Sequence, residues 1–197
     1  MSKSARNRAQ RNVLTQRQVP WGTIAFFSVI GLVAIVAIGY AFLQSRPPSA
    51  DSIEGLIEKE GLSSNHTTAA VRYDTTPPMG GDHDAIWQNC NGRVYTSPLR
   101  NENAVHSLEH GAVWITYRPG LAADQLDRLK SKVENTDYTL MSPYPGLDSP
   151  IVMTAWGKQL KLQSADDSRV DAFLRAFVKG EQTPEPGAPC TGAKDTP

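Results

Sequence analysis

The strongest constraint on this chain is an apolar segment without a charged residue, WGTIAFFSVIGLVAIVAIGYAFL, residues 21–43. Its 23 residues exceed the roughly 20 that an α-helix needs to cross the hydrocarbon core of a bilayer. Trp21 and Tyr40 lie near its two ends, where amphipathic aromatic side chains favour the membrane interface. The segment therefore predicts one transmembrane helix whose partner is the lipid bilayer.

Charge predicts how this helix is oriented. No Asp or Glu precedes Asp51, whereas residues 1–20 form a basic arm. Basic residues stay on the cytoplasmic side, so we expect a cytoplasmic amino terminus, an extracytoplasmic remainder and a single-pass protein of the plasma membrane. A cleavable signal peptide is the alternative, but its apolar region is usually only about 7–15 residues long, which favours an uncleaved signal-anchor. The basic residues of the arm are Lys3, Arg6, Arg8, Arg11 and Arg17.

The remainder of the chain is acidic. Of the 20 basic and 20 acidic residues, five basic ones precede the apolar segment, which leaves 15 basic and 20 acidic residues after it and a formal charge of −5. Nucleic-acid binding needs a positive footprint, so we expect no nucleic-acid partner for this part. The basic arm is interpreted as a topology signal next to anionic lipid.

Two cysteines, Cys90 and Cys190, both fall on the side expected to lie outside the cytoplasm, where disulfides persist. We expect them to pair. Two separate thiols or a redox pair are the alternatives, and the absence of a Cys-x-x-Cys motif gives redox catalysis little support.

Residues 44–70 are predicted to be a linker that contains a short amphipathic helix, because Ile53, Leu56 and Ile57 recur at helical spacing. Residues 71–192 are predicted to form the extracytoplasmic domain, followed by a tail at 193–197. Residues 71–104 are so rich in Pro, Gly, Asn and Asp that they favour a long ordered loop over continuous helix or sheet.

The second half of the chain predicts an α+β domain with helices on one face of a small antiparallel or mixed sheet. The apolar spacing favours helices over residues 121–136 and 165–180, each with one apolar stripe. Alternation and β-branched residues favour strands over the intervening stretches. The order is thus β-α-β-β-α, with strands expected at 112–117, at 138–142, and at 149–156 together with 158–163.

The motif HSLEH, residues 106–110, is the main candidate site. A helix from Glu102 to His110 that ends at Gly111 places His106 and His110 on one face, about 5–6 Å apart at Cβ. Two imidazoles at this spacing suit zinc or copper.

A third donor for such a site comes from the loop sequence GGDHD, which contains His83. Glu109 is a candidate ligand or a partner that orients an imidazole, and Asp82 and Asp84 are further carboxylate candidates. His66, in the polar segment SSNHTT, is interpreted as a solvated loop residue.

Two alternatives to a metal or small-ligand site remain open. In the first, the same His and Glu residues are structural and hold together a non-enzymatic interaction or scaffold domain. In the second, His-x-x-Glu-His is the inverted zinc-peptidase pattern, with Glu109 as the general base of a metal-dependent hydrolase. The sequence shows no nucleophile elbow, P-loop or dinucleotide fingerprint.

Several blocks of the chain resemble one protein family. These are YDTTPPMGGDH, ENAVHSLEHGAVWITYRPGL, SPYPGL, TAWGKQLKL and TPEPGAPC. Over residues 71–192 the sequence is similar to the family catalogued as domain of unknown function 3105, found mostly in bacterial membrane-anchored proteins. The most specific block is the central VHSLEHG.

The resemblance implies a basic cytoplasmic arm, one membrane helix and an exposed domain, and it implies no activity. It carries the family pattern over to the candidate metal residues His83, His106, Glu109 and His110, and to Cys90 and Cys190. Where members often have Cys-Gly-Val-Tyr, this chain has CNGRVY. The expected protein is a single-pass cell-envelope protein of unknown biochemical role.

Overall fold

The computed structural model describes residues 19–44, 52–134 and 136–197. The chain divides into two compact units, residues 1–46 and residues 47–197. Most of the basic arm expected at residues 1–20 and the start of the linker expected at residues 44–70 lie outside the described residues.

Residues 19–44, the described part of the first unit, contain one long helix, α1 (Trp21–Gln44). Residues 21–43 are long and apolar enough to cross a membrane, and nearly all their side chains are exposed. A signal sequence near an amino terminus has the same properties, so α1 is a candidate membrane span.

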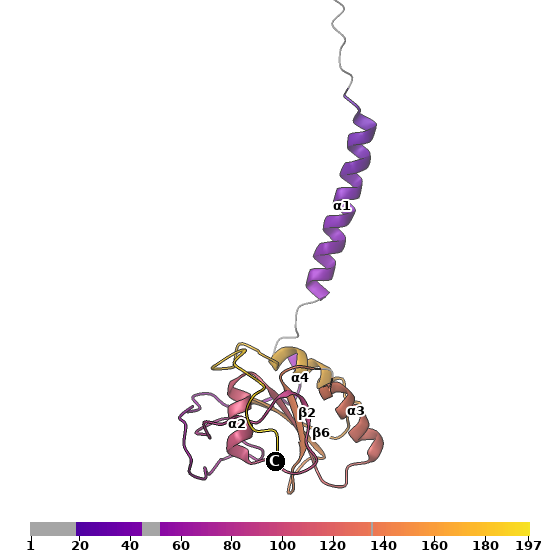
Figure 1. Ribbon diagram of the computed structural model, residues 1–197. Helices are drawn as coiled ribbons and strands as arrows, with labels where there is room; N and C mark the ends of the chain where they lie inside the picture. The colour runs from indigo at the N-terminus through magenta and orange to yellow at the C-terminus, as the bar shows by residue number, and fades with distance from the viewer. Residues whose placement is uncertain (1–18, 45–51, 135) are drawn as a thin grey trace, which may run out of the picture. The chain divides into compact units, whose positions relative to one another are not determined.

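The second unit is an α+β domain built on a mixed six-stranded sheet in the order β1-β6-β5-β3-β4-β2 (Figure 1). β3 is parallel to β4 and antiparallel to β5, and β4 is also parallel to β2. β6 is antiparallel to β5 and β1. The strands are β1 (Ile57–Glu58), β2 (Asn91–Val94), β3 (Val113–Tyr117), β4 (Thr139–Pro143), β5 (Ile151–Ala155) and β6 (Lys158–Leu162).

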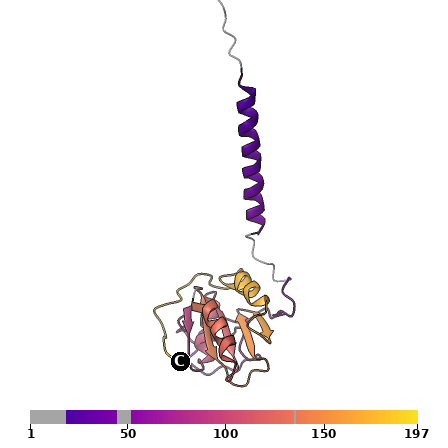
Figure 2. The same cartoon turned by 90° about the vertical axis from the view of Figure 1, so that its right-hand side faces the viewer.

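Two helices, α3 (Ala123–Glu134) and α4 (Arg169–Phe177), cover one face of this sheet. They lie on the same side in Figure 1, and Figure 2 shows them in front of the strands. α3 connects the parallel strands β3 and β4, a connection that needs a crossover element. The apolar stripes expected for the two helices supply this core, with Leu129 and Val133 from α3 and Val170, Phe173, Leu174 and Phe177 from α4.

The shorter helix α2 (Asn101–Glu109) packs on the opposite face of the sheet (Figure 1). Successive side chains of a strand point to opposite faces, so Trp114 of β3 contributes to this second core while its neighbours Val113 and Ile115 contribute to the first. Ala104, Val105 and Leu108 are the fully buried apolar side chains of α2 in this second core.

The elements expected for the second half are present as β3, α3, β4, β5, β6 and α4. The last β of the expected β-α-β-β-α order consists of two separate strands, β5 and β6. β1 and β2 were not expected. The amphipathic helix predicted within residues 52–62 was wrong: residues 52–55 form a turn and Ile57–Glu58 pair with β6 as β1. Gly55, with φ of +79°, interrupts the predicted helix because glycine is a poor helix former that readily takes this conformation.

Residues 71–90 form a long ordered loop along α2. The loop expected from the sequence, residues 71–104, was too long, because it includes β2 and the start of α2. The amide of Asp84 donates to the carbonyl of Glu102, and the amide of Gln88 donates to that of Asn103. A disulfide between Cys90 and Cys190 joins this loop to residues 185–195, which we call the C-terminal strap. The expected pairing of the two cysteines is thus present in the structure.

The C-terminal strap lies across the end of α2. Its amides at Glu185 and Gly187 donate to the carbonyls of Glu109 and His110, and the amide of Lys194 donates to the carbonyl of Trp87. The strap and the loop therefore enclose α2 against the sheet.

Candidate metal centre

α2 positions the candidate site because one of its faces packs on the sheet and the other packs against the loop. Leu108 is fully buried on the sheet side. Ser107 is also fully buried, and its hydroxyl donates to the carbonyl of Gln88 at 2.6 Å. His106 and Glu109 are one helical turn apart, which places their side chains next to each other.

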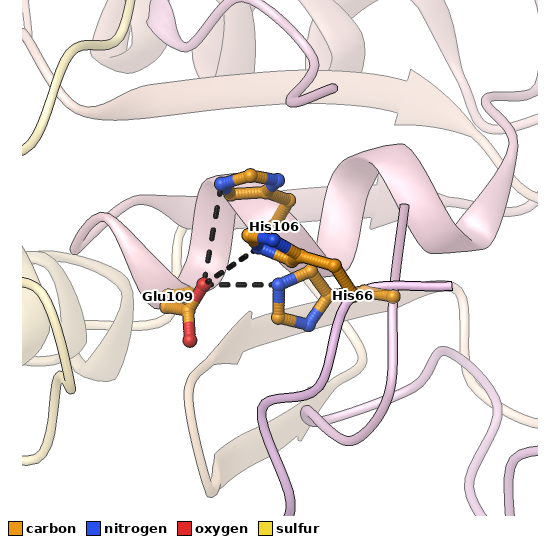
Figure 3. A group of neighbouring side chains, drawn as sticks. His66, His106 and Glu109 are labelled. Atoms are coloured by element: carbon orange, nitrogen blue, oxygen red, sulfur yellow. Dashed lines mark hydrogen bonds and ion pairs between the residues drawn. The ribbon is translucent and has the colours of Figure 1, made fainter. Parts of the chain in front are cut away.

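Four donor atoms converge on this face of α2 (Figure 3). One ring nitrogen from each of three histidines and one carboxylate oxygen all lie within 4.8 Å of one another. A tetrahedral ion with ligands at 2.0–2.1 Å needs about 3.3 Å between its donors, so small side-chain rotations would close the group around an ion. The four residues are His66, His83, His106 and Glu109.

The Oε2 atom of Glu109 is the common neighbour of the three rings. It lies 2.9 Å from Nε2 of His83, 3.9 Å from Nε2 of His66 and 4.0 Å from Nε2 of His106. Figure 3 shows the dashed lines from the rings meeting at this oxygen.

Two of the rings are oriented by backbone carbonyls. Nδ1 of His83 donates to the Gly81 carbonyl at 2.8 Å, and Nδ1 of His106 donates to the Asp84 carbonyl at 2.7 Å. A carbonyl only accepts, so in a neutral ring this bond leaves the lone pair on Nε2. Carbonyl partners of this kind fix the tautomer and direction of metal-binding histidines.

The donor atoms at the centre of the group need a positive charge between them. The lone pairs of neutral imidazoles and the carboxylate oxygen are all acceptors, and Glu109 and His83 are buried. Acceptors facing each other in a buried site are costly unless a positive charge lies between them. A proton on His83 satisfies one pair, whereas a metal ion satisfies all four donors together.

Burial keeps His106 available as a neutral ligand. It lowers the pKa of His106 to about 4; the Asp84 carbonyl opposes this shift, and the nearby His110, His83 and His66 add to it. Burial also lowers the pKa of His110, against the effect of the Pro189 carbonyl. Metal binding requires deprotonated imidazole, so His106 is in its ligating form at neutral pH.

His110, one of the residues that the sequence singled out, lies outside the group of four. Its ring contacts that of His106 at a centroid distance of 4.5 Å. Its Nδ1, however, donates to the Pro189 carbonyl at 2.7 Å, and its Nε2 faces Glu185 at 3.9 Å. The inverted peptidase pattern requires both helix histidines on one ion, and this geometry does not match it.

The candidate carboxylates Asp82 and Asp84 hold the loop in place. Asp82 accepts from the side-chain amide of Asn65 at 3.1 Å, and Asp84 accepts from the Ile86 amide at 2.9 Å and pairs with Arg100. These hydrogen bonds, with one from Ser63 to Asp82, lower the pKa of both carboxyls. Asp84 orients His106 through its backbone carbonyl rather than its carboxylate.

His66 is the residue that sequence reasoning missed. It forms a parallel bridge with His83, because the Thr67 amide donates to the His83 carbonyl and the His83 amide donates to the Asn65 carbonyl. Its ring stacks on that of His106 at 4.9 Å. No local pattern in SSNHTT indicates this pairing. The other three histidines of the chain were already candidates for one site, and this was a reason to add the fourth to the candidate ligands.

Two tryptophans lie beside the cluster. The ring of Trp156 is 6.0 Å from that of His83, and the ring of Trp87 is 5.7 Å from that of His106 and 5.1 Å from that of His110. These rings make the walls of the site apolar, and they place two fluorophores next to the donors.

The family model for proteins of unknown function, DUF3105, matches residues 65–192, which is more than half of the chain. The chain belongs to the DUF3105 family. The match begins immediately before His66 and ends just after Cys190, so this DUF3105 region contains all four grouped donors and both cysteines. No curated protein and no solved structure matches the chain.

Proposed function

We propose that this protein binds one divalent transition-metal ion through His66, His83, His106 and Glu109, in an extracytoplasmic domain that α1 anchors to the plasma membrane. The observation that carries the proposal is the convergence of four acceptor atoms within 4.8 Å. The anchor is supported by the length and apolar character of α1, and the orientation by the basic residues that precede it.

The donor set favours zinc or copper(II). Imidazole nitrogen suits zinc, copper, iron and nickel, whereas copper(I) prefers sulfur. Both cysteines are used in the disulfide, so neither supplies a thiolate. Three neutral imidazoles and one carboxylate leave a divalent ion with a net charge of +1.

Metal analysis of the full-length protein in detergent tests the proposal. We expect one zinc or copper(II) ion per chain after dialysis, and quenching of tryptophan fluorescence by copper(II) because Trp156 and Trp87 lie beside the ligand rings. His106→Asn keeps a donor for the Asp84 carbonyl but removes Nε2. We expect it to weaken metal binding by more than about 100-fold. Loss of a residue that only hydrogen-bonds to a ligand already lowers metal affinity by about 10–100-fold.

His110→Asn is the matched control, because it changes a buried histidine on the same helix that bonds a carbonyl but lies outside the group of four. Its affinity should equal that of the wild type. Absence of a stoichiometric ion in the wild type, or equal affinities of His106→Asn and the wild type, would contradict the proposal.

A structural role is the second candidate, and the 2.9 Å contact between His83 and Glu109 favours it. A protonated His83 satisfies Glu109 without an ion, and the pair then joins the loop to α2. If the wild type binds no ion and His83→Asn lowers the free energy of unfolding by about 3 kcal/mol or more, as expected for breaking a buried pair, the structural role is supported.

A further inference from the structure

The four donors of the proposed site differ in their access to solvent. The side chain of His66 is 51% exposed, whereas that of His83 is 0% exposed and those of His106 and Glu109 are 5% exposed. Three of the donors are thus buried, and the fourth, His66, lies on the solvent side of them. Of the four donors, His66 is therefore the one that solvent reaches.

The histidines that are buried and the one that is exposed also differ in the hydrogen bonds that orient their rings. His83 and His106 each donate from Nδ1 to a backbone carbonyl. Nδ1 of His66 has no hydrogen-bond partner among the residues that the structure describes, and its ring is held by contacts with the rings of His83 and His106. A ligand without such a partner is less firmly oriented toward an ion.

The backbone at His66 is nevertheless fixed. The hydrogen bond from the Thr67 amide to the His83 carbonyl is 2.7 Å long, and that from the His83 amide to the Asn65 carbonyl is 3.0 Å long. A rotation of the His66 ring about its side-chain bonds would therefore leave the main chain paired with the loop.

We infer that His66 is an exchangeable ligand, whereas His83, His106 and Glu109 stay bound to the ion when the His66 ring turns outward. This inference rests on the proposed metal binding. When the His66 ring turns outward, the fourth position opens to water or to a small nitrogen donor such as imidazole. The site is then built to exchange its ion or to accept an external ligand, unlike a structural site closed by four protein ligands.

The rate of metal release tests this inference. Zinc-loaded full-length protein in detergent is mixed with excess chelator, and the transfer of zinc is followed in time. We expect His66→Ala to retain one ion per chain and to release it more than about tenfold faster than the wild type. Loss of a ligand should lower metal affinity at least as much as loss of a residue that only hydrogen-bonds to a ligand. His66→Gln, which keeps a polar side chain, should show the same change.

Chemical rescue separates a lost ligand from a structural defect. Added imidazole should slow zinc release from His66→Ala toward the wild-type rate, because the vacated position faces solvent. It should not restore binding to His106→Asn, whose vacated position is buried. His110→Asn should release zinc at the wild-type rate.

Two results would overturn the inference about His66 while leaving metal binding by the domain itself intact. One is release from His66→Ala at the wild-type rate; the other is complete loss of its ion, as expected for His106→Asn. If the wild type itself holds no ion, both the proposed function and the inference fail.

Discussion

At the scale of single residues, His106 links the site to the stability of the domain. Its pKa is lowered from 6.5 to about 4 in the folded protein, mainly by burial. Between these pH values the unfolded chain binds more protons than the folded one, so the folded state loses stability as the pH falls. The contribution of His106 to the free energy of unfolding is complete above about pH 6.5 and is lost as the pH falls toward 4. The difference in pKa corresponds to about 3 kcal/mol.

We therefore expect the free energy of unfolding of the metal-free protein to fall by about 3 kcal/mol between about pH 7 and about pH 4 through His106. Urea unfolding at a series of pH values measures this change. His106→Asn does not titrate and should give a flatter curve over the same range. Identical curves for the variant and the wild type would show that His106 is not the group responsible.

At the scale of elements, the end of α2 depends on Gly111. This residue has φ of +102°, and a Cβ there would lie 3.0 Å from Cα of Lys179. A glycine at this point lets the chain leave the helix while Lys179 packs closely against it. The amide of Lys179 also donates to the Gly111 carbonyl at 2.8 Å.

Gly111→Ala should therefore lower the free energy of unfolding more than Gly120→Ala does. Gly120 has φ of +91° and no atom within 4 Å of the added Cβ, so this control reports only the left-handed conformation, about 1–2 kcal/mol. We expect a further loss of about 1–3 kcal/mol for Gly111→Ala from overpacking, and weaker zinc binding because Glu109 shifts. Equal losses in the two variants would contradict the close contact with Lys179.

The elements that the sequence predicted are those with a pattern of their own. Val170, Phe173 and Phe177 recur at helical spacing, and this stripe is the buried face of α4. β2 has no such pattern: it contains Gly92 and exists through its backbone pairing with β4. The same reason hid His66, because its place in the site depends on backbone hydrogen bonds to a distant part of the chain.

At the scale of the whole molecule, the disulfide fixes the C-terminal strap to the loop. Cys90 and Cys190 are 100 residues apart in the sequence, and both are buried. Closing a loop of this length stabilises the folded state by up to about 4.7 kcal/mol in the chain-entropy model. The strap that it holds also supplies the Pro189 carbonyl to His110.

We expect the double variant Cys90→Ala/Cys190→Ala to unfold at a lower denaturant concentration than the oxidised wild type, with a loss of up to about 4.7 kcal/mol. Reduced wild type serves as the control and should unfold near the double variant. Alkylation of intact cells before lysis should find no free thiol, as an extracytoplasmic domain requires. Free thiols in that experiment would contradict the proposed orientation.

The position of the C-terminal strap in the sequence also determines when α2 is enclosed. The four donors come from residues 66–109, whereas the strap follows every described helix and strand in the chain. During synthesis the donors emerge first and the segment that encloses α2 emerges after the sheet and both of its covering helices. An ion that arrives early meets the donors before the strap covers α2, so the donor set and the segment that encloses its helix are assembled at different times.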